Sequence, residues 1–375
     1  MLKESNLMKK IFIMIKSKFE VFCIIQNFKF DKNDQHKRNN RKVVAQDAIS
    51  KWYKILKKDE LKYFVKVLKE YRYYSQTTVG KTFEMLVEDK KYEEVKKVID
   101  ENSAIFMPLK KHNDRTETSI AMFTTFMNVL AIDSMQTAQE DTVTWFKNYK
   151  TFETQYYEKE DKLELELENF KKTEQKIFDL EESKKGKEQA IIKSIDRQIV
   201  KLSKSSETSL SEAKKSFEKI KNDHGHEIKA KNIFIIDDFL CSGTSVNNFA
   251  KKVEPYIKDI KKTIYFIFLE ATKEGKDMVE SSDLFKDFSH LKICNIYISE
   301  DFEKNVLKSE SERKRFQQIK MKLYKEYNLK DNSHYKPHTA MSSFVNAPNS
   351  NFAFLSLKKK ESKWFFPFPR NKRSR

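Results

Sequence analysis

Short apolar runs alternate with amphipathic segments along the middle of this chain. Four runs are almost wholly apolar and rich in β-branched and aromatic residues, which is typical of strands buried on both faces of a parallel sheet. They cover residues 103–109, 232–236, 263–269 and 291–298. Segments with apolar residues at helical spacing separate them. The alternation predicts an α/β fold with a largely parallel sheet flanked by helices.

The first hundred residues are predicted to be mostly helical. Apolar residues recur at three-to-four spacing over residues 43–69, 79–87 and 92–99, which indicates a helical N-terminal unit. The aromatic run 71–74 interrupts this pattern. We interpret it as core packing, with the stacking of nucleic-acid bases as the alternative.

Residues 1–40 form a basic extension. Charged residues break up its apolar positions, so it falls short of the ~20 apolar residues of a membrane-spanning helix. Its apolar core at residues 11–15 is also shorter than that of a signal peptide. We predict an amphipathic helix or an irregular extension and no transmembrane segment, with contact to a membrane surface as the alternative.

A strongly charged segment, residues 140–225, separates the first predicted strand from the second. Its narrow apolar stripes are of coiled-coil kind, and a polar stretch at residues 203–209 interrupts them. They predict an antiparallel helical hairpin inserted into the α/β domain, with helices too short and irregular for a long rod. A lid over the active site, a dimerisation arm and a platform for a partner are the roles considered. The run 224–226, His-Gly-His, is interpreted as a loop.

These patterns divide the chain into parts of different character. The expected parts are a basic extension over residues 1–40, a helical N-terminal unit over 41–100, an α/β domain over 101–370 that contains the helical insertion 140–225, and a basic tail over 371–375.

Composition narrows the choice of partner and compartment. The formal net charge is +18, which favours anionic partners such as phosphorylated metabolites, nucleic acid or a membrane surface. The three cysteines, Cys23, Cys241 and Cys294, are widely spaced and form no metal-ligand pattern, which fits a reducing cytoplasm. Because the chain has only five glycines, a glycine in a polar loop carries more meaning than usual.

The most informative chemistry follows the second predicted strand. Asp237 and Asp238 come directly after its apolar run, and a small-residue turn then leads into a helical pattern. Carboxylates at the carboxyl end of a parallel strand suit the hydroxyls of a ribose and can help to hold Mg²⁺. Amides of such a turn, next to a helix N-terminus, bind phosphate. The turn consists of Cys241, Ser242, Gly243, Thr244 and Ser245.

This arrangement predicts a ribose 5-phosphate site. Neither the G-x-x-x-x-G-K-[ST] spacing nor the G-x-G-x-x-G fingerprint is present in the turn. Residues 270–275 follow the third predicted strand and are expected to lie beside the site, because the carboxyl ends of parallel strands share one edge. The alternative is a strand followed by a helix that Ser or Thr caps, with the two acids solvated.

Residues 235–245 resemble the PRPP-binding motif of type I phosphoribosyltransferases: an apolar strand, two acids and a small-residue loop with Gly-Thr. The resemblance implies a type I phosphoribosyltransferase-like fold. It also implies that Asp237 and Asp238 hold the ribose hydroxyls and that residues 241–245 hold the 5-phosphate. Cys241 stands where purine-salvage members carry an acid, which argues against ordinary purine salvage.

The basic segment after the first predicted strand resembles the pyrophosphate loop of the same enzymes in position and pattern. Lys110 and Lys111, with Arg115, are the candidates to meet pyrophosphate, and a solvated basic loop is the alternative. The implied reaction is pentosyl transfer, in which a nitrogen nucleophile attacks the anomeric carbon of PRPP and pyrophosphate leaves. Such a reaction needs Mg²⁺ and cationic groups at the leaving group.

The end of the chain carries a second resemblance. Residues 344–351 and 364–370 look like the C-terminal signature of the PRTase-CE family of bacterial conflict systems, and residues 71–75 resemble its N-terminal part. Asn346, Asn349 and Arg370 are polar candidates there. The resemblance implies a cytoplasmic effector of antiphage defence that acts on PRPP or a nucleotide, with a defence-system protein or a second copy as partner. A non-catalytic nucleotide sensor and a basic nucleic-acid-binding scaffold are the alternatives.

Overall fold

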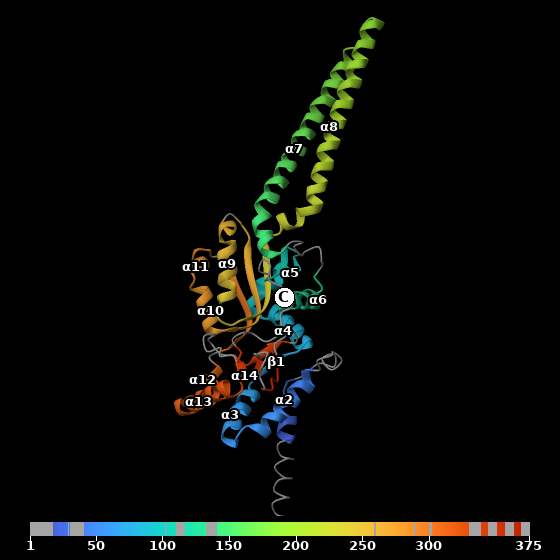
Figure 1. Cartoon of the computed structure of the whole chain (residues 1–375). Helices are drawn as coiled ribbons and strands as arrows, with labels where there is room; N and C mark the ends of the chain where they lie inside the picture. The colour runs from blue at the N-terminus through green and yellow to red at the C-terminus, as the bar shows by residue number, and fades with distance from the viewer. Residues whose placement is uncertain are drawn as a thin grey trace, which may run out of the picture.

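Three parts follow one another along the molecule: a long helical hairpin, an α/β layer structure and a helical lobe (Figure 1). The computed structural model describes residues 18–28, 30, 41–101, 103–109, 117–132, 141–258, 260–288, 290–299, 302–329, 339–343, 351–356 and 364–368.

The central part is a sheet of four parallel strands. Their order in the sheet is the order in the chain, β2-β3-β4-β5. Their bounds are β2 Ala104–Pro108, β3 Asn232–Leu240, β4 Thr263–Thr272 and β5 Leu291–Ser299. Each was predicted from its apolar run, so the mixed α/β class and the parallel sheet are confirmed. The register places Ile105 beside Ile233 and Ile233 beside Ile264.

Helices cover both faces of this sheet. One face carries α4 (Gln76–Glu88), α5 (Glu93–Asp100), which follows the short 3₁₀ turn Lys90–Tyr92, and α6 (Glu117–Val129). The other carries the start of α7 (Thr142–Glu182) and α9 (Thr244–Ile257), while α10 (Lys273–Glu280) and α11 (Asp283–Asp287) connect β4 to β5. Stacked rings from three strands fill the core on the face that carries α4, α5 and α6. Phe106 stacks on Phe234 and Phe234 on Tyr265, at centroid distances of 5.0 and 4.8 Å.

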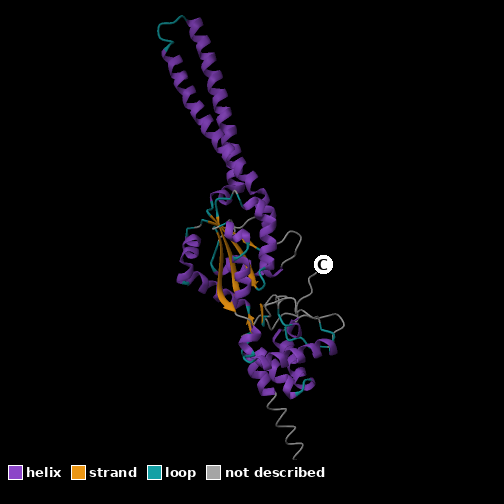
Figure 2. Cartoon of the chain, turned by 90° about the vertical axis from the view of Figure 1, so that its left-hand side faces the viewer, coloured by secondary structure: helices purple, strands orange, loops and turns teal. Residues whose placement is uncertain are grey.

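The helical lobe is built from both ends of the chain. Its core joins α2 (Arg41–Ile55), α3 (Lys58–Lys69), α12 (Phe302–Val306), α13 (Glu310–Glu326), α14 (Ala353–Ser356) and residues 364–368. Two short parallel strands, β1 (Arg72–Tyr74) and β6 (Met341–Ser343), lie between this lobe and the sheet (Figure 2). Trp52 Nε1 donates a hydrogen bond to Phe365 O at 2.8 Å, so the described part of the C-terminal signature, residues 364–368, packs inside the lobe.

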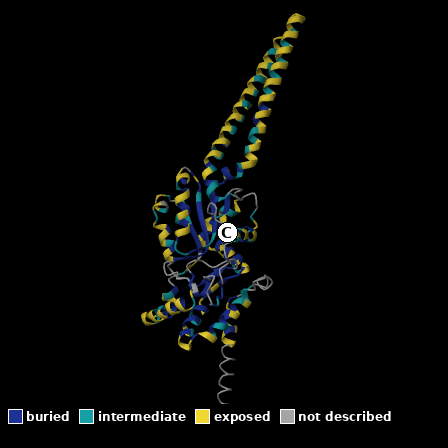
Figure 3. Cartoon of the chain, viewed as in Figure 1, coloured by how far each residue is buried: buried dark blue, intermediate teal, exposed yellow. Residues whose placement is uncertain are grey.

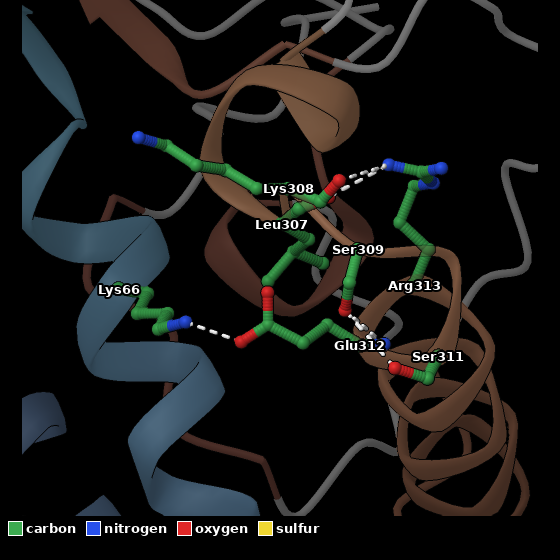
Figure 4. A network of polar contacts seen from close by, with 7 residues as sticks. All are labelled: Lys66, Leu307, Lys308, Ser309, Ser311, Glu312 and Arg313. Carbon is green, nitrogen blue, oxygen red and sulfur yellow. Dashed lines mark hydrogen bonds and ion pairs between the residues drawn. The ribbon is translucent and has the colours of Figure 1, made fainter.

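Polar contacts fix how α13 lies against α3 (Figure 4). Ser309 caps α13, because its Oγ accepts a hydrogen bond from Glu312 N at 3.1 Å. Lys66 Nζ on α3 lies 2.5 Å from Glu312 Oε1, and Arg313 Nη1 donates to Leu307 O at 2.9 Å. Because these side chains are partly exposed, the pair contributes at most about 1 kcal/mol and mainly orients the helices.

The described part of the N-terminal extension is an amphipathic helix, as predicted. Val21, Ile24 and Phe28 are buried in the core of the helical lobe, whereas Phe19 and Phe22 are 66% and 53% exposed. In the described ranges, we find no helix whose length and apolar character would let it cross a bilayer.

The hairpin corrects two expectations. Helices α7 and α8 (Gln189–Lys229) each have 41 residues and are therefore about 60 Å long, so the prediction of short, irregular helices was wrong. The expected interruption at residues 203–209 is also wrong, because α8 runs through it. Serine and threonine cost little in a helix interior, and packing against α7 outweighs that cost.

The hairpin projects from the side of the sheet where the strands begin, opposite to their carboxyl ends. Helix α7 starts at the carboxyl edge, where Thr142 Oγ1 donates to Pro108 O at 2.5 Å, and runs back along the sheet. Helix α8 ends shortly before Asn232 begins β3. The turn between α7 and α8 therefore points away from the carboxyl ends of the strands, as Figures 1 and 2 show, and the lid hypothesis is wrong.

The base of the hairpin is fastened to the sheet. Buried Lys262 Nζ donates to Ile228 O at 2.9 Å and also to Ala230 O, at the C-terminal end of α8. His224 and His226 belong to α8 and not to a loop: His226 Nε2 lies 3.1 Å from Ala104 O. The loop interpretation failed because the glycine between the two histidines is accommodated inside the helix.

Candidate functional site

Asp237 and Asp238 lie within β3 and not after it, because β4 continues beside them. Strand β2 ends opposite Ile236, so beyond that residue β4 is the only strand beside β3 in the described part of the chain. The two half-buried acids thus lie at the carboxyl ends of the strands, where α/β proteins bind ligands.

Hydrogen bonds hold both carboxylates in place. Ser119 Oγ, from α6, donates to Asp237 Oδ1 at 2.8 Å. The backbone amide of Asp238 donates to Asp237 Oδ1 at 2.9 Å, and the amide of Phe239 donates to Asp238 Oδ1 at 2.8 Å. These hydrogen bonds fix the orientation of both carboxylates before any ligand binds.

The electrostatics of this pair favour a bound donor or cation. Burial raises the pKa of Asp238 well above its usual value, and the neighbouring Asp237 carboxylate raises it further. Ribose hydroxyls or Mg²⁺ bound to the pair would offset the free-energy cost of keeping two neighbouring carboxylates charged and partly buried. Within the described ranges no three His, Cys, Asp or Glu side chains gather into a metal site.

The predicted phosphate loop follows directly. Gly243 is the N-cap of α9, with a left-handed φ of +71°, and among the described residues no side-chain hydrogen bond caps this helix. The alternative of a Ser- or Thr-capped helix is therefore wrong. Ser242 Oγ and Thr244 Oγ1 lie 3.0 Å apart at the turn. The N-terminus of a 14-residue helix without a side-chain cap carries partial positive charge and favours an anion.

A second glycine, which the sequence analysis did not single out, shapes this loop. A Cβ added to Gly275 would lie 2.2 Å from Cys241 O, and one added to Gly243 would lie 2.9 Å from Gly275 O. Thr272 Oγ1 donates to Cys241 O and accepts from Gly275 N. The segment 270–275 does adjoin the loop, as expected. The scarcity of glycine was the available signal, since two of the five meet here.

Glu270 was also missed as an organising residue. It lies on β4 beside Phe239 and is 0% exposed. Arg72 Nη2 forms an ion pair with its Oε1, and Tyr74 Oη donates to its Oε2 at 2.5 Å. Strand β1 of the helical lobe is thereby attached to the edge that carries the acids. Tyr71, Tyr73 and Tyr74 are all buried, so the packing interpretation of this aromatic run is confirmed.

The remaining candidates lie outside the described residues. They are Lys110, Lys111, Arg115, Asn346, Asn349 and Arg370. The ends of the segment 110–116 are nevertheless placed. Strand β2 ends at Pro108, and α6 begins at Glu117, two residues before Ser119 reaches Asp237. Both ends of this basic segment therefore lie at the edge that carries the acid pair.

The acid pair and the turn into α9 thus lie together at the carboxyl ends of a parallel sheet flanked by helices. The PRTase-CE family model matches residues 49–370. The chain therefore belongs to the PRTase-CE family and is phosphoribosyltransferase-like, as the resemblance at both ends of that range implied. Comparisons with curated proteins and with solved structures returned no match.

Proposed function

We propose that this protein binds PRPP, or a nucleotide with a ribose 5-phosphate, at Asp237, Asp238 and the loop 241–245, on a type I phosphoribosyltransferase-like fold. The observation that carries the proposal is the distance along the chain between two fixed carboxylates and the start of α9. Only residues 239–243 separate the acids from the N-terminus of α9, whose N-cap residue, Gly243, has no side chain to cap it. A diol clamp near the end of β3 and a phosphate cradle at the start of α9 would thereby lie five residues apart.

In this arrangement each group has one task. The ribose hydroxyls donate to Asp237 and Asp238, which offsets the repulsion between the carboxylates. The 5-phosphate lies over Gly243 at the start of α9, where the missing side chain allows close approach. Lys110 and Lys111 neutralise the pyrophosphate as a nitrogen nucleophile attacks the anomeric carbon and the C–O bond to pyrophosphate breaks. Mg²⁺, when bound, supplies further neutralisation of the leaving group.

The biological setting that we propose is bacterial antiphage defence in the cytoplasm. It rests on membership of the PRTase-CE family and on the resemblance of the tail to proteins of conflict systems. The long hairpin, which enzymes of ordinary nucleotide salvage do not need for transfer chemistry, fits an effector that meets a partner protein.

A non-catalytic sensor is the second candidate. The carboxylate on the strand beside the acids, Glu270, is occupied by Arg72 and Tyr74 and is fully buried. It therefore offers no proton acceptor to an incoming nitrogen base, and Cys241 replaces the acid of the salvage enzymes. Exchange of labelled pyrophosphate into PRPP separates the two candidates, because a sensor binds without exchange.

Calorimetric titration with PRPP and Mg²⁺ tests the binding site itself. The double variant Asp237→Asn/Asp238→Asn is expected to lose binding while its circular dichroism spectrum stays unchanged. The control Glu181→Gln/Glu182→Gln removes the same charge from an exposed pair at the end of α7 and is expected to bind normally. Equal binding by both double variants would overturn the proposal. Salt-sensitive binding of RNA or DNA that survives the Asp changes would instead indicate a nucleic-acid scaffold.

A further inference from the structure

The outer part of the hairpin has an apolar seam that is only half covered. All residues of α7 and α8 are described, and none between 157 and 182 or between 189 and 209 is buried. Nearer the body the same helices bury Trp145, which packs in the core of the sheet, and also Tyr156 and Leu210. Figure 3 shows this change from buried to exposed along the arm. The two helices alone therefore leave the apolar side chains of this seam partly exposed to solvent.

A hollow between the two helices marks the face where this seam is only half covered. Its volume is about 400 Å³, and Phe170, Ile177 and Phe178 of α7 line it together with Ser203, Ser206 and Glu207 of α8. The Phe178 side chain is 61% exposed. A large aromatic ring held in water beside a half-open seam is typical of a helix face that packs against other helices.

Charge along the arm indicates what covers this face. The chain has a net charge of +18, yet basic and acidic residues nearly balance over α7 and α8. Residues 158–168 carry six carboxylates and two lysines, whereas residues 193–204 carry four basic residues and one aspartate. The ring contact between Tyr156 and Phe217, at 5.4 Å, sets the register of the hairpin. It places the basic segment level with residues 169–180, roughly 17 Å further from the body than the acidic one.

We propose that two copies of this chain pair through these faces as an antiparallel four-helix bundle. A two-fold axis near residue 169 lays each acidic segment on the basic segment of the other copy, so the pattern is self-complementary. The outer arm is about 40 Å long and two helices, about 20 Å, wide. Each copy then covers about 800 Å², or about 1,600 Å² in total, which is the size of a stable interface.

Sedimentation velocity of the full chain at micromolar concentration tests the pairing. The expected species has twice the 44.8 kDa of one chain. Phe178→Lys is expected to give a monomer of unchanged helicity. Leu165→Lys is the matched control, because Leu165 is 56% exposed on the same helix but about 140° around its axis, and it is expected to remain a dimer. A monomeric wild type, or a dimer that Phe178→Lys leaves intact, would overturn the proposal.

The direction of pairing is tested with a spin label at the tip. Lys185→Cys is labelled in a chain that also carries Cys23→Ser and Cys241→Ser, since the buried Cys294 does not react readily. Antiparallel pairing places the two labels roughly 50 Å apart, from twice the rise between residue 169 and the tip. Parallel pairing would bring them within roughly 20 Å, about two helix diameters, and would contradict the antiparallel bundle.

Discussion

The contact between Gly243 and Gly275 gives the sharpest test of how the candidate site is built. Gly275→Ala places a Cβ 2.2 Å from Cys241 O, so the backbone of the loop must move by about 1 Å. Overpacking of this kind costs about 1–3 kcal/mol, and loss of the Thr272 hydrogen bonds adds about 1 kcal/mol each. Alanine returns about 1 kcal/mol through its helix propensity. We expect a net loss of about 2–4 kcal/mol.

Two other glycines calibrate this number. Gly243→Ala combines a φ of +71° with a contact of 2.9 Å, and we expect a loss of about 2–3 kcal/mol. Gly186→Ala, at the hairpin tip, has a φ of +73° but no atom within 4 Å, so it carries only the conformational cost of about 1 kcal/mol.

Urea unfolding followed by circular dichroism measures all three variants, and titration with PRPP reports the loop directly. Gly275→Ala and Gly243→Ala are expected to weaken PRPP binding at least tenfold, whereas Gly186→Ala leaves it unchanged. If Gly275→Ala is no more destabilising than Gly186→Ala, the close backbone contact does not exist and the reasoning about the loop is refuted.

Three further predictions concern buried charge. Asp238→Asn is expected to stabilise the protein at pH 7 while it abolishes PRPP binding. Because the pKa of Asp238 is raised in the folded state, the free energy of unfolding falls as pH rises above about 4, and asparagine removes that loss. An equal fall of the free energy of unfolding with pH in the wild type and in Asp238→Asn, measured by urea unfolding, would contradict this. Burial lowers the pKa of Lys262 to about 8, so stability is expected to rise by on the order of 3 kcal/mol between pH 8 and 10.5, and Lys262→Met should abolish that rise in pH-dependent urea unfolding. Arg72→Ala leaves the Glu270 carboxylate buried without its cation and is expected to cost about 2–4 kcal/mol, less than for a fully buried pair because Arg72 is 44% exposed; a loss below about 0.5 kcal/mol in urea unfolding would show that the pair is idle.

The sheet and the acid pair could be predicted from the sequence because their signals are local. Each strand is a short apolar run, and Asp237 and Asp238 stand out directly after one of them. The ends of the strands could not be predicted in the same way. Strand β3 continues through the acids to Leu240 because β4 extends alongside it to Thr272, and this pairing is a tertiary fact.

Other features depend on residues that are far apart in the chain. Strand β1 has three residues and pairs with β6, which begins at Met341. The residues next to Arg72 in the chain therefore give no pattern that predicts a strand. Glu270 gains its meaning only when Arg72 and Tyr74 meet it. The length of α8 was underestimated because its polar stretch offers no apolar period, although α7 lies against it along its whole course.

The helical lobe has a consequence for how the protein is made. Its core requires the indole of Trp52, which emerges early during synthesis, and the backbone of Phe365, which emerges 313 residues later. Helices α2 and α3 must therefore wait, while the sheet and its covering helices can already close. A polypeptide severed ahead of residue 364 would keep the acids, the turn and β6 but would lose the backbone partner of Trp52 in the lobe core. Translation that stops early should thus yield a protein whose helical lobe, and not its sheet, is left incomplete.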